Sequence, residues 1–136
     1  MEGSDELDRS AVRDAPSATL GTIGPDGRPH LVPIIFAVLA SGQLVTVIDH
    51  KPKRTRSLQR LGNIERDSRV ALLIDRYSED WTKLWWVRID GDAHVTESPP
   101  PGGLEALTTK YTVYRTEPPA GPWIVIDPLS VRTWTA

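Results

Sequence analysis

The residues best suited to chemistry lie in one basic segment, DHKPKRTRSLQRL, at positions 49–61. Five of the chain's sixteen lysine and arginine residues fall there: Lys51, Lys53, Arg54, Arg56 and Arg60. No acidic residue follows Asp49 before Glu65. Because the whole chain carries a formal net charge of −2, any attraction for anions must be local to this segment. Such a density of cations suits a phosphate or a polycarboxylate.

Two interpretations of the basic segment are open. Charge runs are commonly a solvated helix face without a ligand. Alternatively, a strand ends at Asp49 and a helix follows, so that Lys51, Lys53 and Arg54 fall in the loop and the first helical turn. Free backbone N–H groups and the positive end of the helix dipole favour an anion there, and cations at that position call for a negative partner. Arg56 and Arg60 either hold part of a ligand or face solvent.

Tryptophan is the second feature that could serve a site, since the chain contains five. Trp85 and Trp86 are adjacent in a strand-like run, so their side chains should point to opposite faces. One is expected to pack in the core and the other to face outward. An outward indole needs cover, either from a partner subunit or from a planar ligand, and the two can coexist.

Several classes of chemistry are disfavoured by what the sequence lacks. The absence of cysteine rules out disulfides, zinc–thiolate sites and thiol catalysis. The three histidines share no metal-ligand spacing with acids, and no nucleophile or phosphate-loop motif occurs. The longest apolar run, residues 31–40, is too short to span a bilayer and contains Pro33. We therefore expect a cytoplasmic protein that binds no metal, membrane or nucleic acid and takes any redox chemistry from a cofactor.

The elements that must position these residues are mainly strands. A length of 136 residues fits one domain. Apolar runs separated by turn residues predict strands at 18–23, 28–38, 44–49, 69–75, 84–97 and 123–135, the last interrupted by Pro128. Helical patterns cover 53–67 and 104–111. With no alternation of strand and helix, six strands and two short helices predict a mainly β fold, a small β-barrel.

Two further expectations concern parts of this barrel. Residues 1–16 are polar and acidic and are expected to form a flexible segment or a short surface helix, ahead of a barrel domain at 17–136. The nearly continuous apolar stretch in the second run predicts a strand buried on both faces. Pro33 within it cannot donate to a ladder, so it should lie at a bulge or at an unpaired edge.

The order of these runs resembles the flavin and deazaflavin oxidoreductases of the split β-barrel class, which are related to pyridoxamine 5'-phosphate oxidase. The resemblance extends over roughly residues 17–96, through ATLGTIGPDGRPHLVPIIF, LVTVIDHKPKRT, RLGNIERDSRVALLIDRYSEDW and LWWVRIDGDAHV. HKPKRT combined with DRYSEDWTKLWWVR is similar to an actinobacterial subgroup that uses the deazaflavin coenzyme F420. The resemblance to this class implies a six-stranded antiparallel split β-barrel of the FMN-binding type.

The resemblance also implies a homodimer with two cofactor sites in grooves at the subunit interface. The cofactor ring would lie against Pro33, Ile34, Ile35 and Phe36. The phosphate end would reach His50, Lys51, Lys53, Arg54 and Thr55. The walls of the cofactor site would be formed by Trp85, Trp86 and Arg88, some of them contributed by the partner chain.

The activity implied is hydride transfer to a small unsaturated or planar acceptor. FMN ends in a single phosphate, whereas F420 carries a phosphodiester and several carboxylates, so five spread cations fit the longer anion better. Two alternative functions stay open: an FMN-dependent enzyme on the same barrel, and a carrier that binds F420 without turnover. No residue is an obvious acid for the substrate, so the catalytic residues are unknown; water, Tyr77 or His50 are the candidate proton donors.

Overall fold

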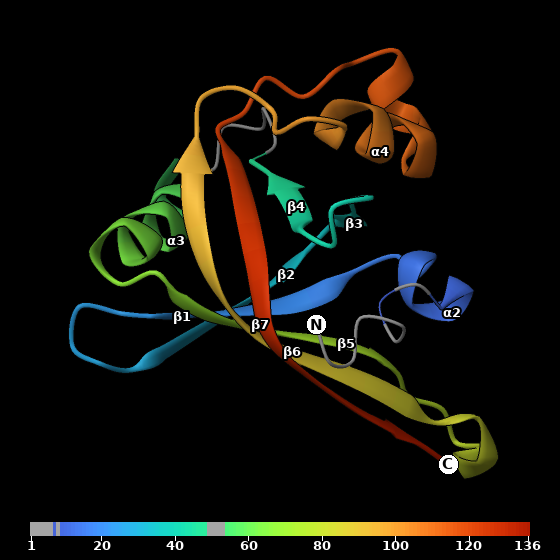
Figure 1. Cartoon of the computed structure of the whole chain (residues 1–136). Coiled ribbons are helices and arrows are strands. Elements are labelled where there is room, and N and C mark those ends of the chain that lie inside the picture. Colours follow the sequence, from blue (N-terminus) through green and yellow to red (C-terminus); the bar gives the residue numbers. More distant parts are fainter. Residues whose placement is uncertain (1–6, 8, 49–53) are drawn as a thin grey trace.

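The fold is a curled antiparallel sheet with a few short helices (Figure 1). The computed structural model describes residues 7, 9–48 and 54–136, with the backbone alone at 54–58. The described strands are β1 (Ala18–Ile23), β2 (Pro29–Ile34), β3 (Ala37–Val38), β4 (Leu44–Val47), β5 (Arg69–Arg76), β6 (Trp85–Thr96) and β7 (Trp123–Thr135). The described helices are α2 (Ser10–Arg13), α3 (Arg54–Arg66) and α4 (Gly103–Lys110), with 3-10 turns at Trp81–Lys83 (η1) and Thr112–Arg115 (η2).

The connection between β2 and β3 curls the sheet. The strand order is β2-β1-β5-β6-β7-β4-β3, so these two strands occupy opposite ends of the sheet. Only Ile35 and Phe36 separate them along the chain. The sheet must therefore bend round until its two ends nearly meet. The predicted single run 28–38 is thus divided: its first half pairs with β1 and its second half with β4. The mainly β, split-barrel prediction is confirmed.

A bulge bends the long ladder between β6 and β7. Asp90 pairs with Ser130 while Gly91 pairs with Pro128, so Leu129 is an extra residue on β7. Proline donates no backbone hydrogen bond, which suits it to this position. A Cβ on Gly91 would lie 2.5 Å from the carbonyl oxygen of Asp127, so only glycine fits the opposite strand. The predicted interruption of the last strand at Pro128 is therefore a local bulge in a continuous strand.

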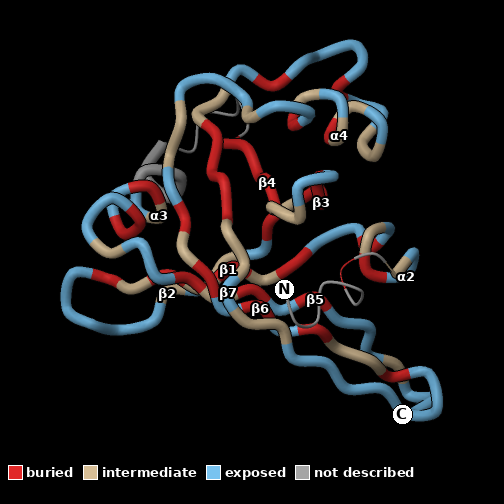
Figure 2. Tube along the Cα trace, in the orientation of Figure 1, coloured by how far each residue is buried: buried red, intermediate tan, exposed pale blue. Residues whose placement is uncertain are grey.

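Two clusters of buried residues form the core. Figure 2 marks the buried positions along the chain in red. The larger cluster fills the concave side of the sheet and includes Leu20, Leu72 and Ile89. The smaller one lies beneath α4 and is built around Trp123 and Leu107. Together they pack α3 and α4 against the sheet and so fix the two helices that bear on function.

Strand β2 is covered on one face only. It is an edge strand of the described sheet, so Pro33 lies where a backbone donor is not required, as predicted. The prediction that the run is buried on both faces is wrong for β2, because Leu31 is 66% exposed and Pro33 is exposed as well. Both faces of β2 carry apolar residues, and only the face with Ile34 packs against the core.

The N-terminal segment adds a short helix to the barrel. Of the two alternatives for this region, the described residues show helix α2, with Val12 fully buried. Leu7 also packs into the larger core cluster. None of the described helices combines the length and apolar character needed to cross a membrane.

Candidate functional site

The face of the sheet that points away from the core is called here the outer face; it is built from alternate residues of β2, β1, β5, β6 and β7. Strand register aligns Pro33, Thr19, Leu73 and Arg88 in one row across four strands. Since neighbouring strands are about 4.8 Å apart, Pro33 and Arg88 are separated by about 14 Å. Leu73 is 38% exposed between them. The outer face thus carries apolar and charged side chains without any cover from the described chain.

The far end of the outer face holds an aromatic pair. Trp86 and Trp134 are opposite each other in the β6–β7 register, and Trp134 is 44% exposed. The Arg88 guanidinium lies 6.0 Å from the centroid of the Trp86 ring, at the limit of a cation–π contact. Trp85 points the other way and packs against the larger core cluster. The predicted opposite orientation of Trp85 and Trp86 is confirmed.

The four residues assigned to the cofactor ring have different environments. Pro33 alone presents an exposed side chain. Ile34 and Phe36 are buried in the larger core cluster, and Ile35 is half-buried against the smaller one. The Phe36 amide donates to the Tyr111 hydroxyl at 3.1 Å, and its carbonyl accepts from Lys110 Nζ at 2.9 Å. Ring contacts by these residues stay a prediction, and Phe36 has no exposed group to offer.

The described part of helix α3 begins at Arg54, and the residues ahead of it, including position 53 where the sequence predicts the helix to start, are not described. His50, Lys51 and Lys53 therefore lie outside the described residues, and Thr55 is described by its backbone only. No acidic residue occupies the first turn of α3. The assignment of this region to a phosphate group stays a prediction.

The C-terminal half of α3 is fixed firmly to the sheet. Leu61 and Ile64 belong to the larger core cluster. The buried Asn63 side chain donates to the Thr22 hydroxyl on β1 at 3.0 Å. Arg66 donates to the Asn63 side-chain oxygen at 2.8 Å and to the carbonyl of residue 23 at 3.0 Å. The described start of the helix, at Arg54, lies about two and a half turns before the Asn63 anchor.

Arg60 is the cation on α3 whose surroundings suggest a ligand. Its side chain is half-buried, and burial lowers the pKa of the guanidinium. Its Nε atom is buried and has no hydrogen-bond partner within the described part of the chain. A charged group that is partly removed from water is costly, so an anion from outside would stabilise the charge of this half-buried guanidinium.

The predicted site residues fall into two groups within one chain. Helix α3 packs on the core side of the sheet, whereas Pro33, Trp86 and Arg88 belong to the outer face. A single small ligand on one chain cannot contact both groups directly through the sheet. A site that contains both would need a second chain.

A feature that the sequence reasoning missed lies beside α4. The Lys110 amino group is directed against Phe36, and burial lowers the pKa of Lys110 to about 8. The available signal was helical spacing, since Lys110 shares a face with the buried residues Gly103 and Leu107. Lys110 belongs to no recognisable sequence motif, so a search for motifs does not identify it.

A curled antiparallel sheet of this order, with its ends joined through a two-residue link, places the molecule in the split β-barrel class. The sequence matches the pyridoxamine 5'-phosphate oxidase family over residues 5–135, and the chain belongs to that family. Members of the family bind flavin or heme, and they include oxidoreductases as well as non-catalytic heme-binding proteins.

Solved structures share the fold at low sequence identity. A conserved hypothetical protein from Mycobacterium tuberculosis is 23% identical, with a TM-score of 0.73 over 99% of this chain and 85% of that one. HutZ, the heme storage protein from Vibrio cholerae, is 13% identical, with a TM-score of 0.70 over 99% and 95%. A heme-binding protein from Mycobacterium smegmatis is 18% identical, with a TM-score of 0.64 over 93% and 54%. No curated protein matches the sequence.

Proposed function

We propose that the chain is an F420-dependent reductase, which acts as a homodimer and transfers hydride to a small unsaturated or planar acceptor. Membership of a family that includes oxidoreductases supports the reaction class. The observation that carries the choice of an anionic cofactor is Arg60, whose half-buried guanidinium keeps an unpaired Nε within the described chain. A cofactor phosphate or carboxylate would stabilise the charge of this guanidinium.

The length of the cationic stretch favours F420 over FMN. Arg60 lies nearly two helical turns after Arg54, or about 9 Å along the helix axis. A single phosphate at the helix start would not extend to Arg60, whereas a phosphodiester followed by carboxylates would. The lack of an acid in the first turn of α3 also favours negative charge at that end.

The outer face supports the homodimer. Leu31, Leu73 and Trp134 are large apolar side chains exposed on this face. Exposed apolar side chains on a sheet face that no described element covers suit the surface of a partner. Within one chain the sheet separates α3 from Trp86 and Arg88. A second chain would therefore have a functional role, because its outer-face residues could reach the cofactor that α3 of the first chain holds.

When bound, F420 would supply a two-electron carrier that releases hydride from its C5 carbon. The chain's own contribution would be binding and orientation. The cations of α3 would hold the negative tail, and the Asn63 anchor would keep that helix in register with β1. Trp86 would offer a flat apolar wall, and Arg88 a cation beside it. No described residue is assigned as a proton donor.

A non-catalytic binding protein is the competing function, and it is favoured by heme-binding relatives within the fold. Stopped-flow mixing of protein-bound reduced F420 with quinones, enones and tetrapyrroles separates the two. A reductase reoxidises the cofactor faster with at least one acceptor than free cofactor does under the same conditions. Reoxidation at the rate of the free cofactor with every acceptor would contradict turnover and leave a carrier.

A further inference from the structure

Lys110 is directed into the protein by the geometry of α4. Gly103, Leu107 and Lys110 share one face of this helix, and the first two are buried. The Lys110 Nζ donates to the Phe36 carbonyl at 2.9 Å and lies 3.7 Å from the centroid of the Phe36 ring. The Tyr111 ring centroid is 5.3 Å from the same nitrogen. The amino group thus lies near two aromatic rings and is partly removed from water.

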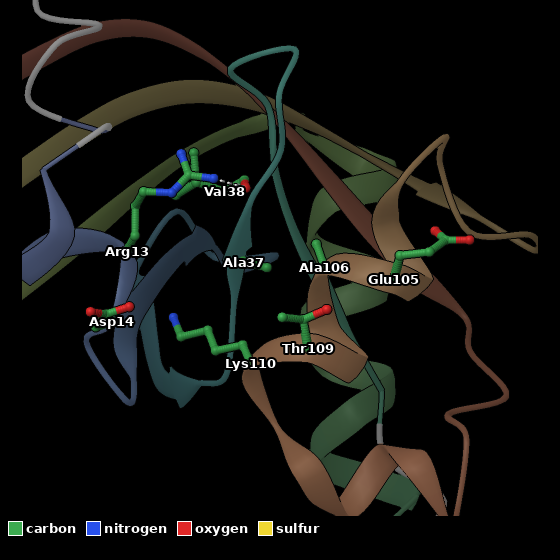
Figure 3. A pocket seen from close by; sticks show the side chains of 8 residues that line it. All are labelled: Arg13, Asp14, Ala37, Val38, Glu105, Ala106, Thr109 and Lys110. Carbon is green, nitrogen blue, oxygen red and sulfur yellow. Dashed lines mark hydrogen bonds between the residues drawn. The ribbon is translucent and has the colours of Figure 1, made fainter.

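A hollow of about 610 Å³ opens beside this amino group, between α2, β3 and α4 (Figure 3). Its volume falls within the range of small-molecule sites. Part of its lining is apolar, from Ala37, Val38 and Ala106. In Figure 3 the Lys110 side chain extends towards Asp14, whereas Glu105 points away. The amine therefore has room for a small organic molecule next to it.

Burial favours a neutral amine at Lys110. It lowers the pKa of Lys110 to about 8, against the Asp14 carboxylate, which raises this pKa; Arg13 lowers it by a smaller amount than Asp14 raises it. Asp14, just after α2, is the charged group towards which Lys110 extends, whereas Arg13 at the end of α2 donates to the Val38 carbonyl at 3.1 Å (Figure 3). Tyr111 is the titratable group at the end of α4, and β3 contributes none. With a pKa of about 8, about one molecule in ten carries the neutral amine at pH 7.

We propose that Lys110 is the nucleophilic amine of a separate site in which a small aldehyde with an apolar tail forms an imine. Desolvation is one of the ways in which proteins activate a lysine amine, and here it acts on an amine that borders a hollow. The apolar part of the lining accepts a hydrocarbon tail. This site is distinct from the cofactor region at α3.

The reaction balances without a further reactant. The nitrogen lone pair attacks the carbonyl carbon, a C–N bond forms, and the C=O π electrons move to oxygen. The two amine hydrogens then leave with that oxygen as water, and a C=N bond remains. The Phe36 carbonyl fixes the position of the amino group before the attack.

The test is imine trapping in the wild-type chain with butyraldehyde and sodium cyanoborohydride, followed by peptide mass analysis. Lys83 is the internal control, because its side chain is exposed and paired at 3.9 Å with Asp80. At pH 7 we expect Lys110 to be reduced to the butyl adduct at least about tenfold faster than Lys83. The ratio should fall as the pH rises past about 8, because exposed lysines keep deprotonating above that pH. Equal or slower trapping at Lys110 would overturn the proposal.

Saturation separates a binding site from a merely reactive amine. The rate at Lys110 should level off with increasing butyraldehyde and should be inhibited by butyramide, which has the same tail and forms no imine. Asp14→Asn should raise the Lys110 to Lys83 ratio at pH 7, since it removes the charge that favours the ammonium form. A linear dependence on aldehyde without inhibition would contradict the site, and this outcome is independent of whether F420 binds at α3.

Discussion

The side-chain amide of Asn63 donates a hydrogen bond to the hydroxyl of Thr22 at 3.0 Å, and it joins helix α3 to strand β1 inside the core. Both side chains are almost completely buried, at 2% exposure each. The pair connects the fold to the proposed function, because it fixes the helix that would carry the cofactor tail.

Removal of this bond should destabilise the protein. Asn63→Ala leaves a buried hydroxyl without its donor, so we expect the free energy of unfolding to fall by about 1–3 kcal/mol. Urea titration measures the change. Gln59→Ala, at an exposed position on the same helix, is the matched control and should change the free energy by less than about 0.5 kcal/mol. Equal effects of the two substitutions would contradict the anchoring role.

Two glycines provide a test of the β6–β7 bulge. Gly91→Ala should lower the free energy of unfolding by about 1–3 kcal/mol, because its Cβ would lie 2.5 Å from the Asp127 carbonyl oxygen. Gly62→Ala lies in helix α3 with no atom within 4 Å of the added carbon, so it should raise stability by about 0.5–1 kcal/mol. Thermal unfolding of both variants should therefore shift in opposite directions; shifts in the same direction would argue against the tight approach at Gly91.

The ion pair between Asp67 and Arg69 should make the free energy of unfolding depend on pH in the acidic range. Hydrogen bonds from the Arg69 side chain and backbone lower the pKa of Asp67 from 3.8 to about 2. A carboxyl with a lowered folded-state pKa contributes stability above its unfolded pKa and loses it as the pH falls through the folded value. The stability difference between wild type and Asp67→Asn should thus be constant above about pH 4 and shrink towards pH 2. A difference that stays constant down to pH 2 would show that the pair does not hold the carboxylate charged.

The outer face should mediate dimer formation. Leu31→Asp places a charge on an exposed apolar position of that face, and we expect a dimer of the wild-type chain to dissociate into monomers. Sedimentation velocity reports the change in mass. Val113→Asp, 59% exposed on η2 and outside the outer face, should leave the dimer intact. A monomeric wild-type chain, or dissociation by both substitutions, would contradict the assigned interface.

Much of the fold could be predicted because apolar runs and turn residues mark strands locally. The strands at 69–76 and 85–96 lie within a residue or two of their predicted bounds, and α3 ends at Arg66, one residue before its predicted end. The division of run 28–38 could not be predicted, because it depends on which strands the two halves pair with. Periodicity in the sequence carries no information about pairing partners that lie far along the chain.

The candidate site was less predictable than the fold. A run of apolar residues indicates that a strand will be covered, and it does not distinguish the protein's own core from a partner, which is why the exposure of Leu31 was missed. Arg60 was left undecided from sequence, and its half-buried state emerges only from the packing of α3. Lys110 escaped notice because its environment comes from Phe36, 74 residues earlier in the chain.

Binding of the cofactor tests the central claim most directly. The purified wild-type protein would be titrated with F420, FMN and heme in parallel, with tryptophan fluorescence as the signal because Trp86 lies on the proposed wall of the site. We predict that F420 binds most tightly, and that Arg60→Met weakens it about tenfold or more, the loss expected for one charged hydrogen bond, while Lys83→Met has no effect. Tighter binding of FMN or heme than of F420, or an unchanged F420 affinity in Arg60→Met, would contradict the account.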